Sequence, residues 1–254
     1  MSGHSKWHNI RLRKGKVDAQ RGQLFTKLSK EIIVAAKSGP SDPEANLRLK
    51  MAVLKARGAN MPVETIKRAI ARSGGEVKGQ TLEEVRYEGY GPVGVAIMVD
   101  AVTDNRHRTA SEMRYVFSRN GGNLGETGCV AWLFVERGVL TVPTAGTLSE
   151  EDLLDCVAVD GVLDVRFEGD TADIITEPPS LGAIREHIER TVVAPRKKAI
   201  LFAGIRSIAK AQIDVPPVDG ASVLALLDRL EEHDDVTSVA SNADIADAVL
   251  EALA

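Results

Sequence analysis

The sequence predicts an α+β protein, with a helical N-terminal domain followed by segments in which helices and strands alternate. Two observations lead to this fold class. Within residues 1–75, apolar side chains recur every three or four positions, which is the period of helices with one buried face. Beyond residue 80, short β-branched runs alternate with helical stretches, which is typical of sheets with helices packed on them.

Three helices are expected in the first domain, over residues 18–37, 43–57 and 62–74. Asp42 is a suitable cap for the second helix, and Pro43 and Pro62 suit the first turns of the second and third. Glycines follow all three. The predicted buried faces are Leu24, Leu28, Ile32 and Ala35; then Leu47, Met51 and Leu54; and then Val63, Ile66, Ala69 and Ile70.

The rest of the chain fits two units of the β-α-β-β-α-β type, each a ferredoxin-like sheet with helices on one face. Strands are expected at 93–99, 130–135, 139–142, 162–167, 172–176 and 236–239, with one or two more within 200–213. Helices are expected after Asp104 and at 149–157, 181–190 and 221–232. Strand pairing is not visible in periodicity, so tandem units and nested units both fit this pattern.

Charge is divided unevenly along the chain. Residues 1–78 hold 17 Lys and Arg against 6 Asp and Glu, a net charge of +11, whereas the remainder holds 15 against 30, a net charge of −15. A chain of this polarity can present its basic end to a polyanion while its acidic body is repelled, which sets orientation as well as affinity. A solvated basic surface without a ligand is the simpler alternative.

Composition narrows the class of protein. Cys129 and Cys156 form no C-x-x-C pair, so neither a disulfide framework nor a zinc knuckle is expected. The first residues lack the apolar stretch of a signal peptide, and no run approaches the roughly 18 apolar residues that span a bilayer. We therefore expect a cytoplasmic protein without a membrane partner.

The basic arm between Lys6 and Lys16 is the most specific signal for a ligand. It holds five Lys and Arg and little that suits a core, and Trp7 among them offers a surface on which an unpaired base can stack, or an anchor that pins the arm to the first domain. The residues predicted to contact nucleic acid are Lys6, Trp7, His8, Arg11, Arg13, Lys14, Lys16, Arg21, Lys27, Lys30, Arg106 and Arg108.

Three local patterns are weaker signals. The segment from Gly89 to Gly94 matches G-x-G-x-x-G, but a strand rather than a helix is expected after it, so no dinucleotide cofactor is predicted. The glycine-rich segment 121–125 favours a structural turn over an anion site. Arg106 and Arg108 lie at a predicted helix start, which suits either a phosphate or a solvated first turn.

No enzymatic machinery is predicted. The sequence shows no nucleophile with a base at a recognisable spacing, no P-loop and no G-x-S-x-G. His4 and His8 lack the further ligands of a zinc site, and His107, His187 and His233 are interpreted as surface or packing residues. Glu83-Glu84 and Asp234-Asp235 are interpreted as solvated charge. We expect no cofactor, no metal and no small-molecule substrate.

Several motifs together resemble the YebC family. They begin with Gly3-His4-Ser5-Lys6-Trp7 and continue in order with 18–22, 25–28, 42–46, 60–62, Tyr87-Glu88-Gly89-Tyr90-Gly91-Pro92, Thr103-Asp104-Asn105-Arg106 and 121–125. The similarity is dense to about residue 142 and thinner beyond, where 235–236 and 241–242 are late matches. Ala243 stands where the family usually has an aromatic residue. Residues 193–204 also differ from the family pattern, and this segment is where the last strand of an inserted domain is expected.

The resemblance implies a three-domain protein in which the third domain is inserted into the second. The expected boundaries are 1–78 for the basic helical domain, 79–136 plus 206–254 for the first ferredoxin-like unit, and 137–205 for the inserted unit. It also implies a non-enzymatic DNA-binding transcriptional regulator. The alternative, by similarity to a mitochondrial translational activator of cytochrome oxidase, is a translation factor that contacts ribosomal RNA through the same domain.

Overall fold

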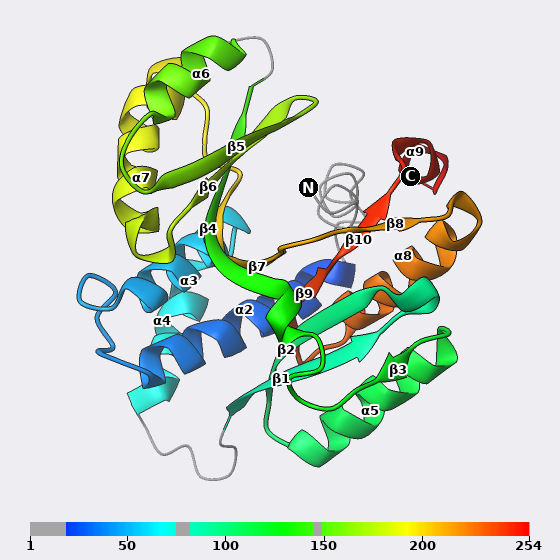
Figure 1. Cartoon of the computed structure of the whole chain (residues 1–254). Coiled ribbons are helices and arrows are strands. Elements are labelled where there is room, and N and C mark those ends of the chain that lie inside the picture. The colour runs from blue at the N-terminus through cyan, green and yellow to red at the C-terminus, as the bar shows by residue number, and fades with distance from the viewer. Residues whose placement is uncertain (1–18, 75–81, 145–148, 254) are drawn as a thin grey trace. The chain divides into compact units, whose positions relative to one another are not determined.

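The computed structural model describes residues 19–74, 82–144 and 149–253, and the chain folds into two compact units (Figure 1). The first unit comprises Met1–Val135 and Ile208–Ala254, and the second comprises Glu136–Ser207. The first unit therefore contains both the helical segment and a sheet, each with its own hydrophobic core. The α+β fold class is confirmed.

Three helices form the N-terminal part of the first unit: α2 (Ala19–Lys37), α3 (Leu47–Gly58) and α4 (Val63–Gly74). Their common core is made of small and branched side chains, which let the helices approach closely. These side chains are Leu28, Ile32, Ala35, Ala36, Leu49, Ala52, Val53, Ala56, Met61, Ile66 and Ala69.

The predicted inward face of α3 was wrong. Leu47 is 49% exposed, and the buried positions are Leu49, Ala52, Val53 and Ala56. The helix also starts at Leu47 rather than at Pro43, because the side chain of Asn46, and not that of Asp42, accepts a hydrogen bond from the Leu49 amide. Since apolar residues occur all round this helix, periodicity did not identify the face. Leu24 and Val63, also predicted to be buried, are exposed in α2 and α4.

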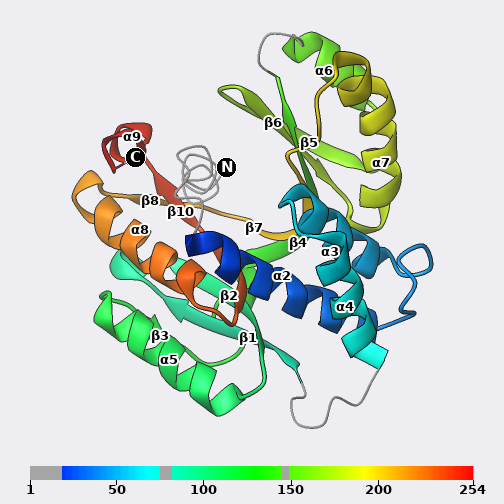
Figure 2. The same cartoon turned by 180° about the vertical axis from the view of Figure 1, so that it is seen from behind.

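The sheet of the first unit has the strand order β3-β1-β2-β9, with every neighbouring pair antiparallel. The strands are β1 (Glu83–Tyr90), β2 (Ala96–Thr103), β3 (Asn123–Leu124) and β9 (Val236–Ser241). Helices α5 (Arg106–Arg119) and α8 (Pro217–Glu232) cover one face (Figure 2). Their buried side chains, including Met113, Phe117, Leu226 and Leu227, pack against Ile97 and Val99 of β2.

The sheet of the second unit has the order β5-β6-β4-β7. Its elements follow the chain as β4 (Phe134–Pro143), α6 (Glu150–Val157), β5 (Val162–Glu168), β6 (Thr171–Thr176), α7 (Leu181–Ile188) and β7 (Phe202–Ala209). This is the β-α-β-β-α-β succession expected for the inserted segment. Two short helical turns, Glu189–Val193 and Ala194–Arg196, follow α7. The last strand β7 forms, although residues 193–204 differ from the family pattern.

The two sheets have the same layout. In each, a split β-α-β unit (β2-α5-β3 or β4-α6-β5) encloses one more strand (β1 or β6), and a final strand that follows the second helix lies at the far edge. In the first unit the enclosed strand β1 is the first strand along the chain, whereas in the second unit the enclosed strand β6 is the third. The expected β-α-β-β-α-β order is therefore wrong for the first unit, because β1 was not predicted at all.

Three other details differ from expectation. Residues 131–133 form a 3-10 turn, and the two strands expected over 130–142 are the single strand β4. A parallel pair of short strands, β8 (Ile213–Val215) and β10 (Ala243–Ile245), adds a second small sheet to the first unit. Helix α9 (Asp247–Leu253) follows β10. Neither β10 nor α9 was predicted.

Two glycines in the first unit test this packing. A Cβ at Gly89 on β1 lies 2.5 Å from the carbonyl oxygen of Asn123 and 2.8 Å from the Phe117 ring, whereas a Cβ at Gly22 in α2 meets nothing within 4 Å. We expect Gly89→Ala to lower the free energy of unfolding by about 1–3 kcal/mol, because the sheet and α5 must separate. Gly22→Ala should raise it by about 0.5–1 kcal/mol, because alanine favours helix. Urea titration measures both, and equal effects would contradict the packing.

Candidate nucleic-acid interface

Helix α2 contacts the first sheet at β9 and β2 (Figures 1 and 2). Two of its lysines make polar contacts there. Lys27 Nζ donates to the carbonyl of Glu231, and Lys30 Nζ lies 2.5 Å from Asp235 Oδ1 and 3.2 Å from the carbonyl of Asp234. Both were predicted to face a phosphate backbone. Their ammonium groups instead join the helical segment to the last turn of α8 and to the acidic turn that follows it.

Asp235 is the centre of this junction, and its side chain is only 6% exposed. In addition to Lys30, it accepts hydrogen bonds from Thr109 Oγ1 at 2.7 Å and from Arg108 Nη2 at 3.3 Å. Burial by itself raises the pKa of a carboxyl group, but the hydrogen bonds from Lys30 and Thr109 outweigh burial and lower the pKa of Asp235 to about 2. The interpretation of Asp235 as solvated charge was therefore wrong.

His233 extends the same network. Its Nδ1 accepts the Asp235 amide at 3.1 Å, so its Nε2 carries the proton and donates to Glu112 Oε2 at 2.9 Å. The carboxylates of Glu112 and Asp235 and the His233 ring lie within 4.8 Å of one another, which is close enough for a metal ion. However, both His233 nitrogens and both Asp235 oxygens are already hydrogen-bonded, so the geometry suits a structural network better than a metal centre.

The other predicted contact residues have different placements. Lys6, Trp7, His8, Arg11, Arg13, Lys14 and Lys16 lie outside the described residues, and Arg21 lies in α2 where its side chain is not described. Arg108 pairs with Asp104 at 2.7 Å as well as with Asp235. Arg106 is exposed, and its Nε lies 4.0 Å from Glu83 Oε2. The structure thus does not bring Lys27, Lys30 and Arg108 together as a phosphate site, because their charges are directed at Asp235 or at backbone carbonyls.

Several exposed cations of the helices are absent from the predicted contact residues. Lys37, Arg57, Arg68 and Arg72 are exposed and, within the described ranges, pair with no carboxylate. Other cations of these helices are paired: Arg48 with Glu84, Lys50 with Glu44, Lys55 with Glu31 and Lys67 with Glu64. Lys67, Arg68 and Arg72 do not fall on the predicted inward positions of their helix, so the helical period in the sequence puts them on its outer face.

The glycine-rich segment is a structural turn, as expected. The Gly122 amide donates to the carbonyl of Phe117, and the Gly125 amide to that of Glu88. The buried Glu88 carboxylate accepts three further amides, from Gly128, Val130 and Ala131. Because burial opposes ionisation but these three donors outweigh it, the pKa of Glu88 is lowered. These amides are therefore not directed at an external anion.

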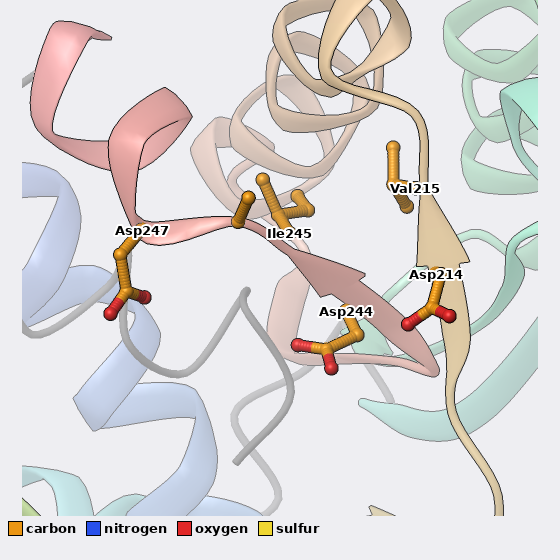
Figure 3. Close-up of a pocket in the computed structure, with 6 residues that line it drawn as sticks. Asp214, Val215, Asp244, Ile245 and Asp247 are labelled. Carbon is orange, nitrogen blue, oxygen red and sulfur yellow. The ribbon is translucent and has the colours of Figure 1, made fainter.

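An acidic pocket lies at the small parallel sheet of the first unit (Figure 3). It has a volume of about 460 Å³ and is lined by Asp214, Val215, Asp244, Ile245, Ala246 and Asp247. Asp214 and Asp244 are paired across β8 and β10, so two carboxylates lie side by side on neighbouring strands. A polyanion is repelled by this arrangement.

The fold and these surfaces define an α+β protein with a basic three-helix segment and two acidic sheets of the split β-α-β kind. Comparison with known proteins gives the family. A model of the TACO1/YebC protein N-terminal domain matches residues 5–76, and a model of the TACO1/YebC second and third domain matches residues 82–243. The chain belongs to the TACO1/YebC family, and its resemblance to YebC proteins is confirmed.

Relatives support this assignment over the whole chain. A protein of Moorella thermoacetica is 50% identical over all of this chain and 99% of its own length, and one of Dictyoglomus turgidum is 46% identical over all of both chains. Each carries the name probable transcriptional regulatory protein. The crystal structure of a conserved hypothetical protein from Aquifex aeolicus superposes with a TM-score of 0.83 at 45% identity, covering 91% of this chain and 93% of that one.

Among the helices of residues 19–74, 82–144 and 149–253, none combines the length and the hydropathy needed to cross a membrane.

The junction at Asp235 makes a prediction about stability and pH. Asp235→Asn removes the charge that Lys30 and Arg108 neutralise, so we expect a loss of roughly 2–4 kcal/mol in the free energy of unfolding at neutral pH. Asp164→Asn is the matched control, because Asp164 pairs with Arg166 on an exposed surface and should cost less than about 1 kcal/mol. Equal costs would contradict a central role for Asp235.

The pH dependence follows from the lowered pKa. An Asp235 whose pKa is about 2 when folded and about 3.8 when unfolded stabilises the fold fully above pH 4. This contribution, about 2 kcal/mol, should disappear as the pH falls from about 4 to about 2. Chemical denaturation across this range should show a smaller loss of stability for Asp235→Asn than for the wild type. Parallel losses in the two proteins would rule out the ion pair.

Proposed function

We propose that the chain is a non-enzymatic nucleic-acid-binding regulator of gene expression, with DNA as its leading target. The observation that supports this most is the group of exposed cations on α2, α3 and α4 that have no carboxylate partner among the described residues. Residues 19–74 hold 11 Lys and Arg against 4 Asp and Glu, so a net charge of +7 remains in the helices even without the arm. The names of the relatives, probable transcriptional regulatory protein, agree with this function.

The affinity in this proposal comes mainly from the phosphate backbone. Each Lys or Arg that neutralises a phosphate releases condensed counterions, which produces binding that weakens steeply with salt. Exposed guanidinium groups such as those of Arg57, Arg68 and Arg72 suit this purpose, because in the described chain a phosphate does not have to displace a carboxylate from them. Cations already paired with carboxylates add less, since a phosphate must compete with the existing partner.

The acidic sheets set the orientation. The chain beyond residue 78 has a net charge of −15, and the pocket around Asp214 and Asp244 adds a local concentration of carboxylates. Nucleic acid is therefore attracted to the helical end and repelled from the sheets. The surfaces of the sheets are then available to contact molecules other than nucleic acid. The proposed function requires no catalytic step and no cofactor.

Crosslinking in cells, followed by sequencing of the attached nucleic acid, tests the proposal. A transcriptional regulator should recover DNA fragments at a restricted set of promoters. The alternative, a ribosome-associated translation factor, should recover ribosomal RNA instead. Recovery no greater than that of an unrelated cytoplasmic protein would reject both functions.

Binding in solution distinguishes a sequence-reading regulator from a general polyanion binder. A promoter duplex recovered from cells should bind about a thousandfold or more tightly than a random duplex at physiological salt. Equal affinities would reject a sequence-reading regulator.

The arm makes a separate prediction. Changing Arg11, Arg13 and Lys14 to Ala removes three cations, so the slope of log affinity against log salt should become shallower by about three or less. Filter binding to a random duplex over a series of salt concentrations measures this slope. A slope identical to that of the wild type would place the phosphate contacts outside the arm.

A further inference from the structure

Helices α3 and α4 are joined by a tight turn of four residues, 59–62. Asn60 adopts a left-handed conformation with φ of 58°, and the Met61 amide donates to the carbonyl of Ala56 at 3.0 Å, which closes the end of α3. Met61 is 4% exposed and packs with Ala56 in the helical core. Two helices connected by a short turn whose apolar residue is buried in their shared core are the elements of a helix-turn-helix.

The inner side of α4 fixes its position. Ile66 and Ala69 are buried in the core shared with α2 and α3, and Ile70 packs against them. The turn and this packing hold α4 on the outside of the three-helix segment. Its orientation therefore does not depend on the surface residues of the helix.

The outer side of α4 is a continuous stripe. The exposed residues recur at helical spacing over three turns, and they are Val63, Glu64, Lys67, Arg68, Ala71 and Arg72. We call this the α4 stripe. Among the described residues, Lys67 pairs with Glu64 of the same helix, and Arg68 Nε donates to the Glu64 carbonyl of that helix. The described contacts of the stripe thus stay within the helix, which leaves its charged groups directed at solvent.

We propose that α4 is a recognition helix that enters the major groove of duplex DNA. The inference rests on the proposed function and names the element that reads the sequence. Three cations against one carboxylate complement the phosphate-lined groove. The B-form major groove, roughly 12 Å wide, accepts a helix of about 10–12 Å in diameter. In a helix-turn-helix, the first turns of the second helix meet the base edges.

The chemistry of the stripe assigns separate tasks to its residues. Lys67 and Arg68 lie in the N-terminal half, where a guanidinium or ammonium group can donate to O6 and N7 of guanine. Val63 is 53% exposed in the first turn and offers an apolar contact for a thymine methyl group. Arg72 lies further along the helix and suits a phosphate. A-form RNA has a deep and narrow major groove, so the α4 stripe fits duplex DNA better than duplex RNA.

Selection from a pool of duplexes with a randomised core of about 20 base pairs tests the inference with the full chain. The wild type should enrich a common sequence. Lys67→Gln combined with Arg68→Gln should lose the preference for that sequence over the random pool by about tenfold or more, because two base-contacting donors are removed. Arg114→Gln combined with Arg119→Gln is the matched control, since these exposed residues of α5 remove the same charge from another surface and should leave the preference unchanged.

The outcomes separate the inference from the proposed function. Both double variants should melt within a few degrees of the wild type, since all four positions are exposed. If the Lys67 and Arg68 variant keeps the wild-type preference, or if the wild type binds the random pool but enriches no sequence, α4 is not a recognition helix and the general function stands. If the wild type binds no duplex at all, the proposed DNA target fails together with the inference.

Discussion

The structure of the first unit depends on one buried charge. Asp235 lies between α8 and β9 and remains ionised because Lys30 of α2 and Thr109 and Arg108 of α5 direct hydrogen bonds at it. A buried carboxylate without such partners is costly, so α2 and α5 must both be in place around the start of β9. The helical segment is therefore not simply tethered to the sheet. Its first helix supplies a counter-charge that the sheet requires.

This constraint changes which cations are available for a ligand. Lys27 and Lys30 lie on the polar face of α2, and from the sequence alone they resemble the other surface lysines. In the structure both ammonium groups are hydrogen-bonded internally, so the proposed phosphate-binding surface consists of other cations of the helices and of the arm. The exposed residues Arg57, Arg68 and Arg72 carry their charge without an internal carboxylate partner in the described chain, and two of the three lie on α4. The chain beyond residue 78 has a net charge of −15, which in the proposed function disfavours a polyanion on the sheets.

The sequence predicted those features that depend on local order, and it missed those that depend on distant contacts. Most helices and strands followed from hydrophobic period, as did the β-α-β-β-α-β succession of the second unit. Strand β1 was missed because Glu83, Glu84, Arg86 and Glu88 make it look like solvated charge, although Val85 and Tyr87 alternate with them. The buried state of Asp235 was missed because its partners Thr109 and Lys30 lie 126 and 205 residues away in the chain. The α4 stripe was visible as a basic helix face. The turn, the packing and the absence of carboxylate partners for Arg68 and Arg72 in the described chain distinguish it from any other solvated face.

The most direct test of the helical segment as the nucleic-acid-binding surface is photo-crosslinking of the full chain to duplex DNA, with the attached peptides identified by mass spectrometry. Attached peptides are expected to come from the first 74 residues, with α4 among them. Peptides drawn mainly from the acidic sheets, or from the strands that line the pocket at Asp214 and Asp244, would contradict the claim that the helical segment holds the nucleic acid.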